Sequence, residues 1–546
     1  MIAQNGASTG ISRRSVLRSG AAIGMAFGVP AVRGIGRASA ADFSTLKVIP
    51  EVDLKILDPV WTTATVTSTH ALLVYDTLFG IDRKQQIHPQ MVEKFGRDED
   101  GLTWHFELRD GLGWQDGTPV TAKDCVASIR RWAARFGLGG IMMQRTERLD
   151  ALDDKSFILK LKEPFDPVPQ TLGNQSQVCF MMRQKDAETD PFTQIKTAVG
   201  SGPFMFLQDE WVPGAKVAYK RNPNHHPRSE PADGYAGGKV AHVERVEWTV
   251  IPEPGTAAAA LSAGEMDYWV TPAANNLPQL KSDPNVALTM LDPLGWQLHL
   301  RFNSLAKPFD NAKMRQAVQM LIETHQQDYL DATGYTGDLG KACLAPFVCG
   351  SPNESEVGLD RFKKYDPDKV KALLKEGGYT GQTIVLMDPT DQAHLHMVAQ
   401  VLNEAMKGVG ITVDLQAMDW STLVSRRAVK DPPPAPGGWH IFPTAWPSST
   451  MMNPVVNQPL DTACDGKNWF GWPCDEELAK LRLTFLAAKN DEERHKAIDA
   501  IQARFLEAAP YAYAGQYFPP VAYRKDRMKG PIGLGSAVFW NIEKFA

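Results

Sequence analysis

The sequence predicts an α/β protein with two or more lobes, and three observations lead to this fold class. The chain has 546 residues, which exceeds the size at which a single hydrophobic core usually stops growing. Hydrophobic residues make up 43% of the chain and charged residues 22%, as in ordinary globular proteins. Segments with the period of a strand alternate with segments with the period of a helix, and no internal repeat is found.

In the first part of the chain, we expect a strand over residues 46–52, the turn Leu57-Asp58-Pro59 and a helix over residues 68–78. Residues 104–108 alternate apolar and polar side chains, which predicts another strand. The turn signal Asp116-Gly117 predicts that this strand pairs with a segment that ends near Val120.

A helix begins after these strands, because Thr121 and Asp124 have the spacing of a capping box. Further strands are expected over residues 157–161 and 215–219. The second half has the clearest helix, in which apolar residues from Met314 to Ile322 follow the spacing i, i+3, i+4, i+7 and i+8.

Asp366-Pro367 begins another helix and Gly377-Gly378 ends it. A strand over residues 383–387, a helix over residues 393–409 and a strand over residues 411–415 then form a βαβ unit. Near the end of the chain, Asn490 and Glu493 cap a last helix.

The first forty residues read as an export signal. They contain five arginines and no acidic residue. Arg13 and Arg14 form a twin-arginine pattern, an apolar run follows, and Ala38-Ser39-Ala40 is a small-x-small cleavage site. We therefore expect residues 1–40 to be a Tat signal peptide that is cleaved near Ala40, and the mature protein to be periplasmic. The remaining chain is mildly acidic, which gives no electrostatic footprint for nucleic acid.

The six cysteines suit an oxidising compartment. Cys464 and Cys474 are ten residues apart and Cys343 and Cys349 are six apart, so both pairs are candidates for disulfides that close short loops. Cys125 and Cys179 are expected to be buried free thiols.

Motifs for catalysis or for a cofactor are not found. The only G-x-S-x-G pattern begins at Gly6 and lies in the signal segment, and no phosphate loop or zinc-protease motif occurs. His394 and His396 alternate on a predicted helix and so do not share a face. We expect them to be surface histidines and predict no metal site and no cofactor.

Several segments, in one order, resemble the family 5 extracellular solute-binding proteins, which are the peptide, nickel and opine receptors of ABC importers. The most recognisable is Gly101-Leu102-Thr103-Trp104-His105-Phe106-Glu107-Leu108-Arg109, followed by Trp114-Gln115-Asp116-Gly117-Thr118-Pro119. The other matching segments are residues 121–124, 200–204, 221–224, 260–267, 302–303, 308–310, 315–317 and 372–379.

The resemblance implies a two-lobed periplasmic-binding-protein-like fold with an extra inserted domain, mixed sheets flanked by helices and a ligand cleft between the lobes. Domain I would comprise residues 41–75, 215–296 and 516–546, domain II residues 76–214 and domain III residues 297–515. Gly295 and residues 513–517 would be hinges. The protein would be a monomer that closes on a small-molecule ligand and delivers it to ABC transporter permease subunits in the inner membrane.

The resemblance also points to ligand-binding residues. One segment of the family's site follows the first Leu-Asp-Pro, which makes Trp61, Thr62 and Thr63 candidates here. A second segment extends from Gly438 to Pro454 and contains Trp439 and Trp446, and Asn303 is a third candidate. The alternative is that these side chains pack in the core or in loops.

Peptide binders of the family carry an aspartate that pairs with the α-amine of the peptide. Ser449 occupies that position here, in a segment that is one residue longer, so ordinary peptide binding is in question. Met451 and Met452 suggest a more apolar contact.

Two other functions remain open at this stage. A chemosensory solute receptor would have the same binding fold and a different partner. A Tat-exported periplasmic enzyme folded around a cofactor would need a cofactor motif, and none is present in the sequence.

Overall fold

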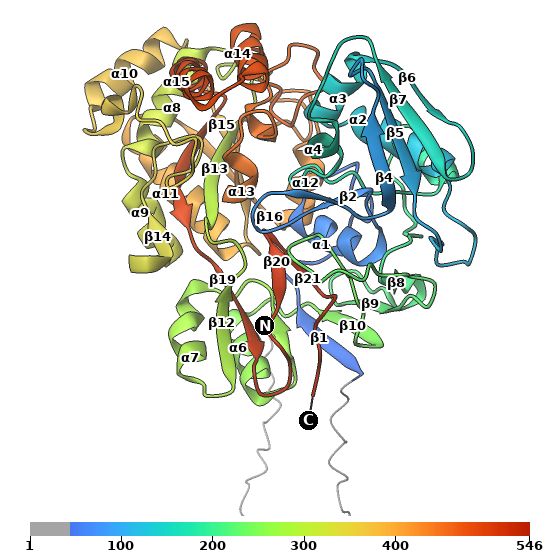
Figure 1. Ribbon diagram of the computed structural model, residues 1–546. Coiled ribbons are helices and arrows are strands. Elements are labelled where there is room, and N and C mark those ends of the chain that lie inside the picture. Colours follow the sequence, from blue (N-terminus) through green and yellow to red (C-terminus); the bar gives the residue numbers. More distant parts are fainter. Residues whose placement is uncertain (1–43, 546) are drawn as a thin grey trace, which may run out of the picture. The chain divides into compact units, whose positions relative to one another are not determined.

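The structure is a computed structural model that describes residues 44–545 (Figure 1). The predicted signal segment, with Arg13, Arg14, Ala38 and Ala40, lies outside the described residues. The described chain contains three larger sheets, which we use to define a first lobe, an inserted domain and a second lobe.

A seven-stranded mixed sheet forms the first lobe. The central strand β1 pairs in parallel with β10 and β11, and the other pairs are antiparallel. Helix α6 (Pro254–Ala263) packs against β11 and β19. The strands, in their order across the sheet, are β12 (Val286–Met290), β19 (Pro520–Arg524), β11 (Tyr268–Trp269), β1 (Thr45–Ile49), β10 (Arg245–Thr249), β9 (Lys216–Arg221) and β8 (Phe204–Phe206).

A six-stranded mixed sheet forms the second lobe. The predicted βαβ unit is confirmed, since β15 and β16 are parallel and α11 (Ala393–Gly408) connects them. Helices α8 (Ala312–Glu323) and α9 (Gln326–Thr333) pack on β18. The strands, in order, are β14 (Gly340–Lys341), β18 (Tyr511–Tyr517), β13 (Trp296–Phe302), β17 (Ile441–Pro447), β15 (Ile384–Pro389) and β16 (Val413–Met418).

The inserted domain is a four-stranded antiparallel sheet covered by α2 (Ala122–Ala133) and α3 (Gly137–Gln144). Its strands, in order, are β4 (Val92–Arg97), β5 (Thr103–Leu108), β7 (Ser156–Leu161) and β6 (Thr146–Ala151). The capping box is confirmed, because the Asp124 carboxylate accepts from the amide and hydroxyl of Thr121. The expected partner of β5 is wrong: β5 pairs with β4 and β7, and the Asp116-Gly117 turn closes only a bridge between Gly113 and Pro119.

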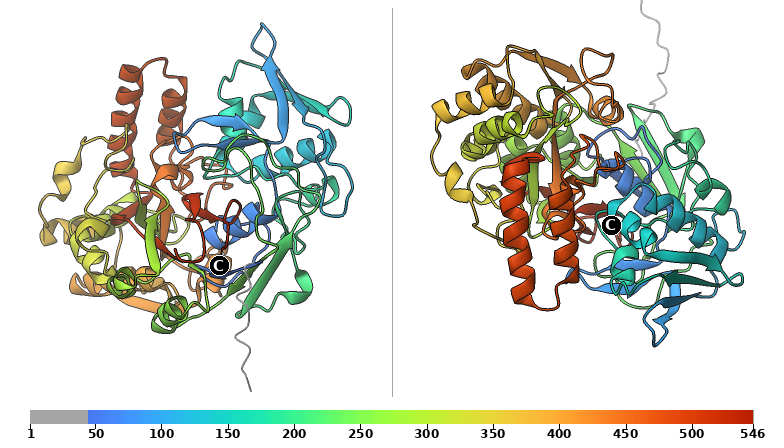
Figure 2. Two further views of the ribbon diagram at one scale, coloured as in Figure 1. Left: turned by 60° about the horizontal axis from the view of Figure 1, so that its bottom comes forward. Right: turned by 90° about the horizontal axis from the view of Figure 1, so that it is seen from above.

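Smaller elements complete the described chain. Helices α14 and α15 form an antiparallel pair beside the second lobe (Figure 2). No helix within residues 44–545 has the length and apolar character of a membrane span. The remaining elements are α1 (Thr65–Val74), β2 (Phe79–Ile81), β3 (Ile87–Pro89), α4 (Val168–Leu172), α5 (Gln184–Ala187), α7 (Leu277–Ser282), α10 (Pro367–Glu376), α12 (Trp420–Arg426), α13 (Ser448–Met451), α14 (Glu476–Ala487), α15 (Asp491–Ala508), β20 (Ile532–Leu534) and β21 (Ser536–Val538).

Two short crossovers join the sheets of the lobes. Residues 291–295 connect β12 to β13, and residues 518–519 connect β18 to β19. Gly295 lies in the first crossover with a φ of 65°, a conformation that favours glycine. A Cβ at this position would collide with the carbonyl oxygen of Tyr517 in the adjacent strand.

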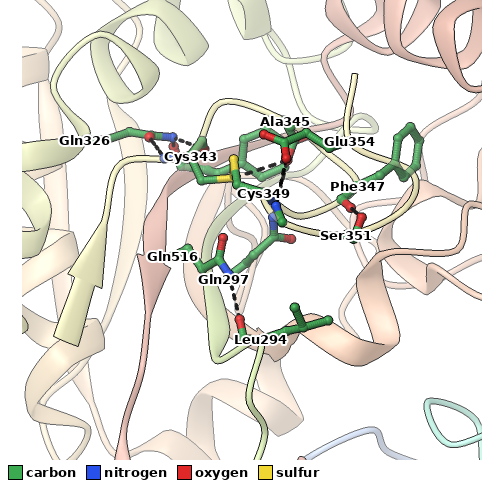
Figure 3. The surroundings of a disulfide bond; sticks show 12 residues. Leu294, Gln297, Gln326, Cys343, Ala345, Phe347, Cys349, Ser351, Glu354 and Gln516 are labelled. Atoms are coloured by element: carbon green, nitrogen blue, oxygen red, sulfur yellow. Dashed lines mark hydrogen bonds between the residues drawn. A yellow bond between two sulfur atoms is a disulfide. The ribbon is translucent and has the colours of Figure 1, made fainter. Parts of the chain in front are cut away.

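Cys343 and Cys349 form a disulfide next to these crossovers, and Cys464 and Cys474 form a second one. Figure 3 shows that Gln326 brackets Cys343, donating to its carbonyl oxygen over 2.8 Å and accepting from its amide over 2.6 Å. In the same region, Gln516 donates to the carbonyl oxygen of Leu294 over 2.6 Å. Cys125 and Cys179 are buried free thiols.

A buried ion pair connects the start of the chain to the inserted domain. Asp58 and Arg131 meet through two hydrogen bonds of 2.8 and 3.1 Å, and both side chains are at most 1% exposed. Asp58 also accepts from the amides of Val60, Trp61 and Ile195. Arg131 donates to two further carbonyl oxygens. Every oxygen and nitrogen of this charge pair therefore has a partner, as a buried ion pair requires.

We predict that Asp58→Ala lowers the free energy of unfolding by about 3–5 kcal/mol, because it leaves the Arg131 guanidinium buried without its carboxylate. Denaturant titration of the purified protein measures this change. Glu492→Ala is the matched control, since the Glu492–Lys496 pair is exposed and such pairs contribute less than about 1 kcal/mol. Equal losses in the two variants would contradict the prediction.

Candidate functional site

Three cavities lie side by side between the first lobe, the inserted domain and the second lobe. We name them after their characteristic residues: the arginine cavity contains Arg427, the aspartate cavity contains Asp292, and the wide cavity contains Asp53. The arginine and aspartate cavities share Thr65, Trp420 and Ala445. The aspartate and wide cavities share Glu51, Thr271 and His394. Their volumes are about 50, 50 and 540 Å³.

The arginine cavity has walls from all three parts of the described chain. Strand β17 contributes Thr444 and Trp446, and the inserted domain contributes Gln175. The Trp446 indole packs edge-on against Trp469 at 5.1 Å, and its nitrogen is buried without a hydrogen-bond partner among residues 44–545. An aromatic wall beside a few polar groups is typical of small-molecule sites.

Arg427 follows α12 and is 1% exposed. Its Nη2 donates to the hydroxyls of Thr62 and Thr63 over 3.3 and 3.4 Å, and its Nε has no partner in the described part of the chain. Aromatic rings surround it, with Phe470 at 4.7 Å and Trp469 at 5.4 Å from the guanidinium carbon. Burial in these surroundings lowers the pKa of Arg427 to about 9.

Ser449 belongs to a polar cluster beside the arginine and aspartate cavities. Its hydroxyl donates to Asp292 over 2.6 Å and accepts from the Gln175 amide over 2.8 Å. The cluster thus connects α13 of the second lobe, the first crossover and the inserted domain. Burial raises the pKa of Asp292, and the hydrogen bonds from Ser449 and from the Leu294 amide oppose this shift.

The wide cavity is acidic. Glu51 and Asp53 face it from the first lobe, and Asp391 and Asp419 from the second. Among residues 44–545, Lys55 is the one lysine or arginine in its lining, and it pairs with Asp419 over 2.6 Å. Burial raises the pKa of Glu51 to about 7, with a smaller contribution from the charge of Asp391 and an opposing hydrogen bond from Gln392.

The other residues singled out in the sequence lie elsewhere. Trp61 and Thr62 line a fourth cavity of about 260 Å³ between the inserted domain and the second lobe. Trp439 is fully buried, donates to the carbonyl oxygen of Val429 over 3.2 Å and packs on Phe442. Asn303 is fully buried and donates to the carbonyl oxygen of Trp439 over 3.0 Å. Trp439 and Asn303 line none of the four cavities described here.

Sequence reasoning missed Arg427, Asp292, Glu51 and Trp420. Trp420 has a local signal, since Asp419 caps its helix. Arg427, Asp292 and Glu51 have no local sequence signal, because their burial depends on contacts between distant segments. His394 is a correction: it is not a free surface histidine but lines the aspartate and wide cavities, and burial lowers its pKa to about 4. Within residues 44–545, no group of three acidic, histidine or cysteine side chains is placed to hold a metal ion.

Two lobes joined by two crossovers, with cavities between them, define a binding protein of the periplasmic-binding-protein type. Residues 86–459 match the model of the bacterial extracellular solute-binding proteins, family 5, middle region. The chain belongs to this family. It is accordingly a solute-binding protein that serves transport, and not an enzyme.

The chain is 40% identical over 538 residues to a probable peptide ABC transporter periplasmic-binding protein, y4tO, of Sinorhizobium fredii, covering 98% of this chain and 99% of that one. Among solved structures, it is similar to AgaA of A. tumefaciens R10 in complex with agropinic acid, with a TM-score of 0.76, 19% identity, and 92% and 99% of the two chains covered. It is also similar to DppA of Helicobacter pylori with the peptide STSA, with a TM-score of 0.74, 20% identity, and 92% and 98% covered.

We predict that Glu51→Gln flattens the dependence of the melting temperature on pH. Because the pKa of Glu51 rises from 4.5 to about 7 in this structure, the structure is favoured when Glu51 is protonated. This stabilisation is full below pH 4.5 and is lost as the pH rises through about 7.

Thermal unfolding of both proteins between about pH 4.5 and pH 8 tests the prediction. Other titratable groups also face the wide cavity and affect both proteins, namely Asp53, Asp391, Asp419, Lys55 and His394. The contribution of Glu51 is therefore the difference in melting temperature between the variant and the wild type at each pH. Parallel melting curves across this range would show that Glu51 does not contribute.

Proposed function

We propose that this protein is the solute-binding component of an ABC importer and that it captures a small solute in the cavities between its lobes. The main support for this proposal is that both lobes and the inserted domain contribute residues to one set of adjoining cavities. The family and the 40% identical periplasmic-binding protein support this role. The solute would be peptide-like, opine-like or a metal complex, in line with the peptide, the agropinic acid and the nickel–histidine complex named for structurally similar proteins.

Capture would occur by hinge closure about the two crossovers, residues 291–295 and 518–519. A solute that contacts both lobes favours the closed arrangement by its differential affinity, and the permease then recognises that arrangement. The domain limits expected from the sequence remain a proposal. The expected hinge segment, residues 513–517, lies within β18, so we place the second hinge at residues 518–519.

Within the site, we assign ligand contact to Trp446 and Ser449, which line or adjoin the arginine cavity. Thr62 would hold Arg427 and Trp61 would line the neighbouring fourth cavity. Trp439 and Asn303 would support the wall behind β17 through their mutual hydrogen bond. The carboxylate missing at position 449 would be replaced by Asp292, which lies 2.6 Å from the Ser449 hydroxyl.

Export would follow the twin-arginine route with cleavage near Ala40, because residues 1–40 carry the ordered signals for both. The mature protein would act in the periplasm, as the name of its 40% identical relative indicates for that protein. It would act as a monomer that meets the permease subunits at the inner membrane.

A thermal-shift screen tests the proposed function. The probes are the tetrapeptide Ser-Thr-Ser-Ala, the dipeptide Met-Leu, agropinic acid and a nickel–histidine complex, which are ligands named for structurally similar proteins. A solute present at 100 times its Kd adds about 2.7 kcal/mol to the free energy of unfolding. We expect a shift of several degrees for at least one class of solute. Turnover of a probe by the purified protein would refute the receptor function.

Trp446→Ala should abolish that shift or weaken it strongly, because it removes an aromatic wall of the arginine cavity. Phe95→Ala is the control, since Phe95 is 43% exposed and lies on the inserted-domain sheet away from the cavities. Calorimetric titration of both variants with the active probe gives the affinities. Equal affinities would remove Trp446 from the site.

A further inference from the structure

Six arginines are buried in the described part of the chain, and Arg427 differs from the other five. Arg131, Arg482 and Arg524 each pair with an aspartate. Arg301 and Arg315 have no such partner, but main-chain carbonyl oxygens surround them. Arg301 donates to those of Phe470, Pro459, Pro510 and Trp469 over 2.6–3.3 Å.

Arg427 has neither kind of partner. Its guanidinium carries five N–H donors, and the residues described here provide only the two long contacts to Thr62 and Thr63. No carboxylate among residues 44–545 lies within ion-pair distance of it. An ionised group that is 99% buried and lacks a counter-charge is destabilising unless something else completes its environment.

The aromatic rings around Arg427 do not replace the missing acceptors. A cation–π contact satisfies the face of the guanidinium, whereas its N–H donors lie in the plane of the group. Arg301 can be compared directly with Arg427, because it also lies over Trp469, at 5.0 Å. Its guanidinium nevertheless donates to four carbonyl oxygens. The unsatisfied donors of Arg427 border the arginine cavity.

The surroundings of this cavity favour negative charge. In the described part of the chain, no acidic side chain lines the arginine cavity, whereas Ser68, Thr444 and Thr450 line it and carry hydroxyl groups. The fourth cavity, which shares Thr63 with it, has Arg135, Lys430 and Lys467 in its lining and no acidic residue. The acidic residues gather instead at the wide cavity, beyond the aspartate cavity. The charge between the lobes is therefore divided into a basic end and an acidic end.

We propose that the transported solute carries an oxyanion, a carboxylate or a phosphoryl group, and that this group enters the arginine cavity and pairs with Arg427. The planar fork of the guanidinium accepts either group through two parallel hydrogen bonds. The nearby hydroxyls supply further donors. This inference rests on the proposed function, because it assigns a chemical class to the solute of the same site. The remainder of the solute extends toward Asp292 and the wide cavity.

The first test needs no known solute. The wild type, Arg427→Met and Arg301→Met are unfolded in guanidinium chloride to release any bound molecule, refolded and melted. We expect the solute-free Arg427→Met to melt at or above the wild-type temperature, because methionine fills the space without a buried charge. Arg301→Met should melt below it, since its loss leaves four carbonyl oxygens unpaired. A melting temperature of Arg427→Met below that of the wild type would overturn the inference.

The second test uses sodium acetate and sodium phosphate as probes, with sodium chloride at equal ionic strength as the reference. Acetate or phosphate should raise the melting temperature of the wild type and of Arg426→Gln, and leave that of Arg427→Gln unchanged. Arg426 is the matched control because it is the last residue of α12, directly before Arg427, and donates to the carbonyl oxygens of Gly437 and Gly438. A response to acetate alone assigns a carboxylate, and one to phosphate alone assigns a phosphoryl group. Equal responses in all three proteins, or none in the wild type, would overturn the inference.

Peptide probes separate this inference from the proposed function. If Ser-Thr-Ser-Ala or Met-Leu shifts the wild type, its C-terminal amide should bind about 30-fold or more weakly, because a buried charge pair loses one partner. Arg427→Lys, which keeps the charge without the fork, should bind the free acid with intermediate affinity. A solute that binds the wild type and Arg427→Gln equally refutes the inference alone. A wild type that responds to no organic probe refutes the proposed function.

Discussion

The site depends on the buried ion pair between Asp58 and Arg131. Asp58 gathers the amides of Val60, Trp61 and Ile195 around one carboxylate, and Arg131 holds that carboxylate from α2 of the inserted domain. The residues that follow, Thr62 and Thr63, contact Arg427 of the second lobe. A single charge pair thus fixes the segment on which the inserted domain, the first lobe and the second lobe converge. Apolar residues of similar volume often stabilise a fold as well as a buried ion pair does, so the structural contribution of this pair is the positioning of the segment that it holds.

The cavities contain charged or titratable groups that have no partner of opposite charge in the described part of the chain. Arg427 lacks a counter-anion at one end, while Glu51 and Asp391 lie in one acidic cavity at the other. The raised pKa of Glu51 and the lowered pKa of Arg427 have the same main cause, which is burial away from water. A solute with complementary charges relieves both. In the proposed hinge closure, recognition and closure would be one process, because the groups that bind the solute would be those that closure desolvates.

Much of the fold could be predicted from local patterns, and the site could not. The capping box at Thr121, the helix after Asn311, the βαβ unit and the cap at Asn490 depend on residues a few positions apart, and the structure contains them. The resemblance points to Trp446, which lines the arginine cavity, and to Ser449, which accepts from Gln175 beside that cavity. Trp439 is only seven residues from Trp446 and packs in the core, because its environment comes from Val429 and Phe442. Arg427 and Asp292 acquire their roles from residues more than a hundred positions away, such as Thr62 and Ser449, and no local pattern carries that information.

The two disulfides have a consequence for how the protein is made. Each joins cysteines within a single loop, six and ten residues apart, so neither is needed to bring distant parts of the chain together. In the proposed export by the twin-arginine route, the chain would fold before it crosses the membrane, in a compartment where thiols stay reduced. A chain whose crosslinks are all local reaches its final topology with free thiols and oxidises afterwards without rearrangement. Under that proposal, biogenesis would have two independent steps, folding of the lobes on one side of the membrane and formation of the two disulfides on the other.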